Sequence, residues 1–207
     1  MKKHIIFDFD DTLSSSYNLN QQIFYETLLS FSANIDEAYV RNYHKTAMGL
    51  SMYELFDHIV KKYSLNKTTK ELVEENERLN KTRSEEMSIL EGVEELLIHF
   101  KKYGKVLSIC SNRDKVSLDL ILKKHGLAKY FDNIISCVDI GHQKPDAFCL
   151  VNLLKKYPQI SNDETIYFGD SKTDEEFAAN AGIDCLVVDQ YLNRKKFYAL
   201  LLGIFSV

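Results

Sequence analysis

The sequence predicts an α/β fold, a three-layer, Rossmann-like parallel sheet core with an inserted α-helical cap domain. Beyond residue 88, short apolar runs alternate with stretches of helical spacing, as in chains that build a parallel sheet with helices on both faces. Before that point, residues 15–87 hold one glycine and no proline, so little interrupts helix. We therefore assign residues 1–14 and 88–207 to the α/β core domain and residues 15–87 to the helical insert.

The strands of the core are predicted from short apolar runs. The first run, residues 3–9, ends in carboxylates, as expected of a buried parallel strand that reaches a site. Later runs of the same kind predict further strands at residues 106–110, 133–137, 165–168 and 185–188.

Helices are predicted from apolar spacing and from the residues that end them. In the core, the helical stretches are 93–100, 115–125, 147–157 and 174–181. In the insert, Thr68 and Glu71 have the spacing of a capping box, and we expect three or four helices. We also expect the apolar tail, Phe197 to Val207, to form a terminal helix on the core, with a dimer contact as the lesser possibility.

Composition restricts the class of protein and its partners. The formal charge of −4 and the pI of about 5.9 argue against nucleic acid as a partner. The four cysteines form no CxxC pair, which favours reduced core thiols in a cytoplasmic protein. Because Asp8 breaks the first apolar run at once, we do not expect this run to be a signal peptide, and we expect the apolar tail to be too short to span a membrane. We expect a monomer or a homodimer.

Polar side chains follow each predicted strand at the point where it ends. In an open parallel sheet, a site lies beyond the carboxyl ends of the strands. The predicted order of strands and helices places the following residues at that edge: Asp8, Asp10, Asp11, Thr12, Ser111, Asn112, Lys144, Gly169, Asp170, Ser171 and Asp174.

These residues resemble the four motifs of the haloacid dehalogenase-like hydrolase superfamily. The segment from Asp8 to Leu13 resembles the first motif, and Ser111 at the end of an apolar strand resembles the second. Lys144 before Pro145 is similar to the third, and the segment from Gly169 to Asp174 to the fourth. All four occur in family order, and the insert follows the first motif, where one branch carries a helical cap. That branch includes phosphoglycolate phosphatases and β-phosphoglucomutases.

Chemistry and resemblance indicate the same site. Carboxylates crowded at strand ends need a cation, and oxygen ligands without histidine or cysteine suit Mg²⁺. Asp8 is the candidate nucleophile on phosphorus, and Asp10 the candidate general acid and base. The resemblance implies that Mg²⁺ binds the carboxylates of Asp8 and Asp170 and the backbone carbonyl of Asp10.

The remaining site residues have supporting roles in the same interpretation. The resemblance implies that Asp174 supports the metal or ligates it through water. Ser111, Asn112 and Lys144 would bind the phosphate, with Ser111 and Lys144 stabilising the charge that develops on its oxygens. Taken alone, Ser111 is more simply interpreted as a cap of the helix that follows it, and Lys144, beside a proline, as a solvated loop lysine; the order and placement of all the motifs together favour the functional interpretation.

The insert offers candidates for substrate contact. Arg41, His44 and Lys45 cluster before a segment that resembles the cap loop facing the site in capped members of the superfamily. A lysine there could bind a carboxylate or a second phosphate, or form a Schiff base. The alternative is a solvated basic helix face.

The leading functional hypothesis is a phosphatase that acts on a small phosphorylated metabolite, without nucleic-acid or membrane partners. A phosphosugar mutase of the β-phosphoglucomutase type would use the same Asp8 and Asp10 but return the phosphate to its substrate. A phosphonoacetaldehyde hydrolase-like enzyme is disfavoured, because those relatives replace the residues at Asp10 and Lys144. A non-catalytic binding module is disfavoured because it has no need of the complete set of polar residues.

Overall fold

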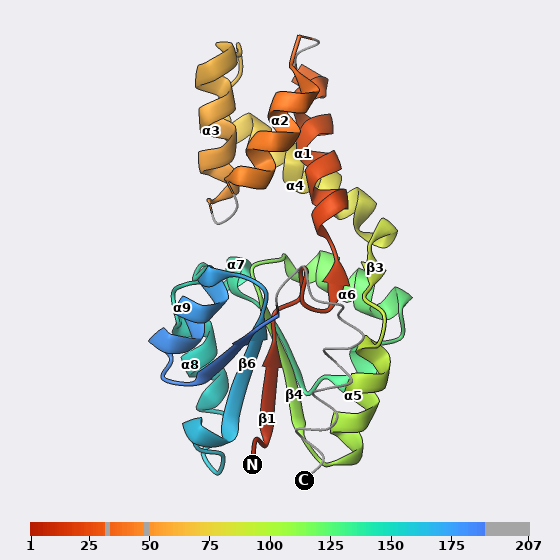
Figure 1. The fold of residues 1–207 in the computed structure, drawn as a ribbon, viewed down its shortest axis with the longest axis vertical. Helices are drawn as coiled ribbons and strands as arrows, with labels where there is room; N and C mark the ends of the chain where they lie inside the picture. The colour runs from red at the N-terminus through yellow and green to blue at the C-terminus, as the bar shows by residue number, and fades with distance from the viewer. Residues whose placement is uncertain (32–33, 48–49, 189–207) are drawn as a thin grey trace. The chain divides into compact units, whose positions relative to one another are not determined.

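The structure is a computed structural model that describes residues 1–31, 34–47 and 50–188 (Figure 1). The chain divides into two compact units. Residues Ser16–Met87 form one, here called the helical unit, and Met1–Ser15 with the described residues from Ser88 onward form the core unit. The chain leaves the core unit through the two-residue strand β2 (Ser14–Ser15) and re-enters it through β3 (Ser88–Ile89). These two strands pair antiparallel.

The core unit is built on a five-stranded parallel sheet, as the sequence predicts. The strand order is β5-β4-β1-β6-β7, so β1 lies at the centre. Its strands are β1 (His4–Phe7), β4 (Val106–Ser111), β5 (Asn133–Ser136), β6 (Thr165–Gly169) and β7 (Asp184–Val187). In the β1 register, Phe7 lies opposite Ile109 on one side and Phe168 on the other. The first residues beyond the strands are therefore delivered to one edge of the sheet.

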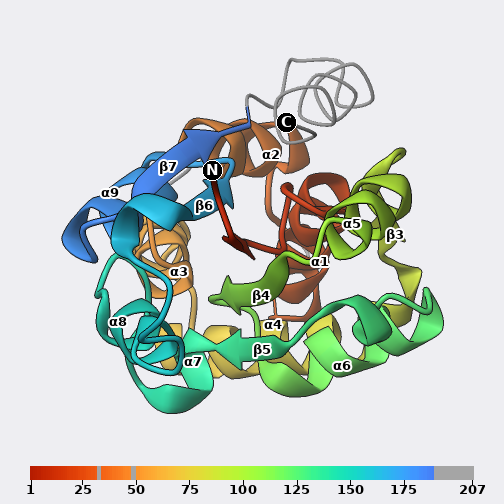
Figure 2. The same cartoon turned by 90° about the horizontal axis from the view of Figure 1, so that it is seen from below.

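Helices pack on both faces of this sheet (Figure 2). On one face, side chains from α8 and α9 join Ile6 and Tyr167 in a buried cluster. On the other, Phe7 packs against Phe168 and against Phe100 of α5, with ring centroids 5.3 and 6.3 Å apart. The helices of the core unit are α5 (Val93–Lys102), α6 (Lys115–Lys124), α7 (Cys137–Ile140), α8 (Phe148–Leu154) and α9 (Lys172–Asn180).

The helical unit has its own apolar core. Its helices are α1 (Tyr17–Phe31), α2 (Glu37–Thr46), α3 (Met52–Tyr63) and α4 (Thr69–Arg83). Phe24, Phe56 and Leu72 are fully buried at its centre. The predicted capping box is present: the Thr68 hydroxyl accepts from the Glu71 amide, and the Glu71 carboxylate accepts from the Thr68 amide.

Some boundaries differ from those that apolar spacing predicts. Helix α9 begins at Lys172 because Ser171 caps it, two residues before the predicted start. Helix α8 ends at Leu154 and is shorter than predicted. The predicted terminal helix, Phe197 to Val207, lies outside the described residues. Among the described helices, none combines the length and apolar character needed to cross a membrane.

His4 is a buried histidine inside the sheet, away from the carboxylate-rich edge. It is fully buried in β1, and its Nε2 lies 2.9 Å from the Ser108 hydroxyl. Its Nδ1 has no hydrogen-bond partner among the described residues. Burial lowers the pKa of His4 to about 4, and Asp132 offsets only part of that shift. The neutral imidazole is therefore the form that the fold accommodates.

This burial predicts acid sensitivity in a defined pH window. Below the ordinary histidine pKa of 6.5, His4 binds a proton in the unfolded chain but stays neutral in the folded protein until the pH reaches about 4. The His4 contribution therefore destabilises the protein as pH falls from 6.5 to about 4, by about 3 kcal/mol in total. Urea unfolding of wild type and His4→Gln across this window measures it. The difference between the two proteins should change with pH, and parallel curves would contradict the prediction.

Candidate active site

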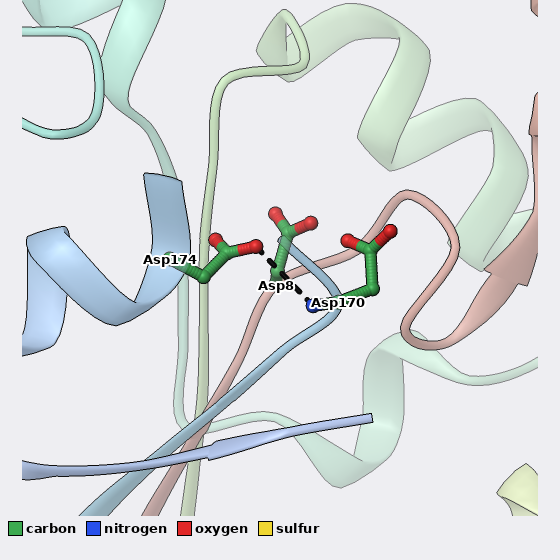
Figure 3. Close-up of side chains that lie close together, drawn as sticks. All are labelled: Asp8, Asp170 and Asp174. Carbon is green, nitrogen blue, oxygen red and sulfur yellow. Dashed lines mark hydrogen bonds between the residues drawn. The ribbon is translucent and has the colours of Figure 1, made fainter. Parts of the chain in front are cut away.

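Asp8 is the first residue after β1 and lies at the centre of the carboxylate-rich sheet edge. Its side chain is 7% exposed, and Oδ1 accepts a hydrogen bond from Lys144 Nζ at 2.7 Å. One carboxylate oxygen of Asp8 lies within 4.8 Å of an oxygen of Asp170 and of Asp174. Figure 3 shows these three carboxylates facing a common space. The structure therefore brings together three acids that the sequence places after two different strands, Asp8 after one and Asp170 and Asp174 after the other.

The turn after β6 holds Asp174 against the strand end. The Asp174 carboxylate accepts hydrogen bonds from the backbone amides of Asp170 and Ser171, both at 3.2 Å, and from the Ser171 hydroxyl at 2.6 Å. Gly169 makes this possible, because a Cβ at that position would lie 2.3 Å from Asp174 Cβ. Only glycine at position 169 leaves room for the Asp174 side chain. The hydrogen bonds from Asp170 and Ser171 then fix the Asp174 carboxylate in the turn.

Lys144 links two of these acids. Its Nζ donates to Asp8 Oδ1 at 2.7 Å and to Asp174 Oδ1 at 2.6 Å, and its side chain is 6% exposed. The predicted alternative, a solvated loop lysine, is therefore wrong. Burial alone would lower the pKa of Lys144, but the charges of Asp8 and Asp174 raise it above its ordinary value. Lys144 is thus a fixed positive charge beside Asp8.

Tyr167 supports Lys144 from inside the sheet. Its hydroxyl donates to the Cys110 carbonyl at 2.8 Å, and its oxygen lies 3.3 Å from Lys144 Nζ. The same oxygen is 3.3 Å from Asp174 Oδ1. Sequence reasoning missed this tyrosine because it stands inside an apolar strand. The available signal was its position three residues before Asp170, because a buried tyrosine hydroxyl usually needs a hydrogen-bond partner.

Ser111 and Asn112 end β4 at the same edge. Ser111 is buried, and its Oγ accepts from the Arg113 amide at 3.2 Å. The predicted alternative for Ser111, capping the next helix, is wrong because Asp114 caps α6. The Asn112 amide holds the backbone of Lys144: Oδ1 accepts from the Lys144 N–H at 2.8 Å and Nδ2 donates to the Lys144 carbonyl at 3.5 Å. The Asn112 side chain is thus engaged in placing Lys144.

Asp10 belongs to the tight turn that follows β1. Asp11 has a left-handed backbone, with φ of 54°, a conformation that aspartate tolerates better than most residues. The Asp10 carboxylate pairs with Arg113, whose Nη2 donates to Oδ1 at 2.7 Å. Sequence reasoning missed Arg113, although it stands two residues after Ser111 at a strand end rich in acids. A basic residue at that position was the only signal.

The site carries an excess of negative charge. Lys144 pairs with Asp8 and Asp174, and Arg113 pairs with Asp10, so two cations stand against four carboxylates when Asp170 is included. Among the described residues, the Asp170 carboxylate has no hydrogen-bond or ion-pair partner. This donor set, all oxygen and short of positive charge, fits a hard divalent cation.

The pKa values of the acids express the same imbalance. Burial raises the pKa of Asp8 to about 7, although the neighbouring Lys144 opposes the shift. Burial also raises the pKa of Asp170 to about 8, and the charges of Asp8 and Asp174 add to the effect. Burial alone would raise the pKa of Asp174, but Lys144 and Ser171 lower it below its ordinary value. Asp8 and Asp170 are therefore the carboxylates that a cation would stabilise most.

The three candidates from the insert lie on α2 in the helical unit. Arg41 donates to Glu37 at 2.7 Å and to Gln21 at 3.3 Å. His44 is buried with its ring 5.0 Å from that of Phe24, and burial lowers its pKa. Lys45 is exposed. His44 therefore packs in the core of the helical unit, whereas Lys45 is on its surface.

The fold and the site together define a class of protein: an α/β protein with buried carboxylates and a lysine at the carboxyl edge of a parallel sheet. The sequence profile described as "Haloacid dehalogenase-like hydrolase" matches residues 5–188. The chain therefore belongs to the haloacid dehalogenase-like hydrolase family.

Individual relatives agree with this assignment. The phosphoglycolate phosphatase of Vibrio cholerae is 32% identical over 91 residues, which span 44% of this chain but only 40% of that relative. The pyrophosphatase PpaX of Bacillus mycoides is 25% identical over 93% of this chain and 86% of its own length. Among solved structures, the hydrolase YfnB of Bacillus subtilis, bound to magnesium, superposes with a TM-score of 0.77 at 19% identity. That alignment covers 100% of this chain and 99% of YfnB and shows a shared fold.

Proposed function

We propose that this protein is a Mg²⁺-dependent phosphohydrolase that cleaves phosphate monoesters of small metabolites through an aspartyl-phosphate on Asp8. The observation that carries the proposal is the environment of Asp8. Its carboxylate is buried at a strand end, accepts a hydrogen bond from Lys144, and lies within 4.8 Å of the carboxylates of Asp170 and Asp174. The relatives named phosphoglycolate phosphatase and pyrophosphatase support phosphoryl chemistry.

The side chains have distinct roles in this proposal. Asp8 attacks the phosphorus, and Lys144 lies where it can hold a phosphoryl oxygen and keep Asp8 ionised. Ser111 supplies a hydroxyl to the same phosphate, and Asn112 contributes to phosphate binding by fixing the Lys144 backbone. Asp10 gives a proton to the leaving oxygen and then takes one from the water that hydrolyses the intermediate.

Mg²⁺ fits the oxygen donors of the site. The carboxylates of Asp8 and Asp170 and the backbone carbonyl of Asp10 would hold it, with Asp174 supporting the turn. Such an ion would offset the excess of carboxylates and the negative charge of the phosphate. The magnesium bound in YfnB supports the choice of metal.

The remaining parts of the proposal concern the whole protein. We propose that the helical unit acts as a cap that selects the substrate, with Arg41 and Lys45 as its candidate contacts and His44 acting through the packing of α2. We further propose a cytoplasmic enzyme, because the described cysteines, Cys110, Cys137, Cys149 and Cys185, are all free.

Phosphate release tests the proposal directly. The purified protein is incubated with a panel that includes phosphoglycolate, sugar phosphates, nucleotides and pyrophosphate, with Mg²⁺ or with a chelator. We expect release from at least one of these substrates and its loss with the chelator. Folded protein that releases phosphate from none of them would contradict the proposal. In that case, conversion of a phosphosugar in the presence of a bisphosphate primer would identify the mutase, and no conversion the binding module.

Asp170 provides a prediction that does not depend on knowing the substrate. Its raised pKa means that ionised Asp170 destabilises the metal-free fold, so Asp170→Asn should stabilise it. We expect the melting temperature in chelator to rise by about 2–4 °C for each kcal/mol relieved. Mg²⁺ should raise the melting temperature of wild type but not of the variant. Exposed Asp163→Asn is the matched control, and a lower melting temperature of Asp170→Asn in chelator would contradict the prediction.

A further inference from the structure

Arg113 is a buried arginine that grips one carboxylate with two parallel hydrogen bonds. Its side chain is 6% exposed, although it lies in the short loop between β4 and α6. Nε donates to Asp10 Oδ2 at 2.9 Å, and Nη2 donates to Asp10 Oδ1 at 2.7 Å. This forked geometry fixes the plane of the carboxylate as well as its distance. A lysine at the same position could supply only a point charge.

Arg113 is the fixed member of the pair. Its backbone amide is tied to Ser111 Oγ at 3.2 Å, and its side chain is more deeply buried than that of Asp10, which is 27% exposed. Burial alone would lower the pKa of Arg113, but the charge and hydrogen bonds of Asp10 raise it. The loop between β4 and α6 thus fixes the position of the Arg113 guanidinium, and the guanidinium in turn orients the Asp10 carboxylate.

We propose that Arg113 is a positioning residue that sets the direction of the Asp10 carboxylate for proton transfer at the leaving oxygen. This inference rests on the proposed phosphohydrolase function. In the first step an Asp8 oxygen bonds to phosphorus, the ester P–O bond breaks, and the leaving oxygen takes the proton of Asp10. In the second step water bonds to phosphorus and returns a proton to Asp10, and the bond between phosphorus and Asp8 breaks.

The alternative role for Arg113 is structural support of the turn after β1. The two roles differ in how they depend on the leaving group. An alkoxide leaves only with a proton, whereas p-nitrophenolate leaves without one. A residue that acts through Asp10 is therefore needed more for an alkyl phosphate than for p-nitrophenyl phosphate. A purely structural residue is needed equally for both.

The experiment compares kcat/KM for glycerol phosphate and p-nitrophenyl phosphate in wild type, Arg113→Met and Arg113→Lys. Each variant is also made in an Asp10→Ala background, and exposed Arg78→Met is the matched control. We expect Arg113→Met to lower kcat/KM for glycerol phosphate by about 10- to 100-fold, which is no more than the low end of the roughly 10²- to 10⁴-fold effect of general acid–base catalysis itself. The factor lost on p-nitrophenyl phosphate should be at least fivefold smaller. Arg113→Lys should recover part of the loss, and Arg113→Met should cost nothing further when Asp10 is already alanine.

Several results would overturn the inference. Equal losses on the two esters, or a further loss in the Asp10→Ala background, would show that Arg113 does not act through Asp10. Thermal unfolding identifies variants that fail to fold, and Arg113→Lys, which keeps the charge, then carries the comparison. Wild-type protein that hydrolyses neither ester nor any other phosphate would overturn the proposed function itself. Activity in wild type with a uniform loss in the variants overturns only the role of Arg113.

Discussion

Asp8→Asn is expected to reduce phosphate release by at least about 10⁴-fold, the scale on which removal of a catalytic nucleophile acts. An amide oxygen at this position is too weak a nucleophile to bond to phosphorus. The fold should survive, because burial already disfavours the ionised form of the Asp8 carboxyl group and raises its pKa to about 7. Replacing it with a neutral amide removes that cost. Initial rates with saturating Mg²⁺, together with thermal unfolding, separate lost chemistry from lost structure.

The control for Asp8→Asn is Asp163→Asn, an aspartate in the same unit that is exposed and remote from the sheet edge described above. We expect it to retain wild-type rates. If Asp8→Asn kept more than a hundredth of wild-type activity on the preferred substrate, another group would have to be the nucleophile.

Lys144→Met is expected to have the second-largest effect, on both activity and stability. The substitution keeps an unbranched apolar side chain close to the length of the lysine stem, but removes the ammonium group that lies 2.7 Å from Asp8 and 2.6 Å from Asp174. Breaking a buried pair by removing one partner typically costs about 3–5 kcal/mol, because the other charge stays buried. Loss of a cation at the phosphoryl oxygens should lower kcat by about 10³-fold, equivalent to about 4 kcal/mol in the barrier.

The matched control is Lys172→Met, since the Lys172 side chain is 84% exposed and lies one turn from Glu176 on α9. Urea unfolding and steady-state kinetics of both variants provide the measurement. Mg²⁺ should recover part of the stability that Lys144→Met loses, because it offsets the same carboxylates. Unchanged stability in Lys144→Met would show that the ion pairs seen in the structure are not maintained in solution.

The central part of the site was predictable from sequence for a simple physical reason. Parallel strands end at one edge of a sheet, so residues that follow β1 and β6 must meet there. Asp8, Lys144, Asp170 and Asp174 were each ambiguous alone, and the topology of the sheet brings them within hydrogen-bonding or metal-binding distance. Fold class and gathering of the acids therefore follow from strand order and the position of each polar residue.

The contacts that organise the site could not be predicted in the same way. Nothing in the sequence says that Arg113 turns toward Asp10, because a loop arginine can point to solvent at little cost. Asn112 looked like a phosphate ligand, yet its amide is used on the backbone of Lys144. Such partners depend on side-chain directions that only the packed loops fix.

His44 shows a signal that was present but overlooked. It follows Val40 by four residues on α2, and Val40 is fully buried, so the two lie on the same buried face of the helix. The basic neighbours Arg41 and Lys45 drew attention to charge, whereas helical spacing already predicted that His44 packs inward.

The most direct test of the proposed chemistry is to find where the phosphoryl group resides during turnover. The protein is mixed with a ³²P-labelled substrate and Mg²⁺, quenched in acid within milliseconds, digested and mapped by peptide. We predict hydroxylamine-sensitive label on the peptide that contains Asp8 in wild type, and none in Asp8→Asn. Label on the peptide that contains Asp170 and Asp174, or equal labelling of Asp8→Asn, would contradict the assignment of Asp8 as the nucleophile.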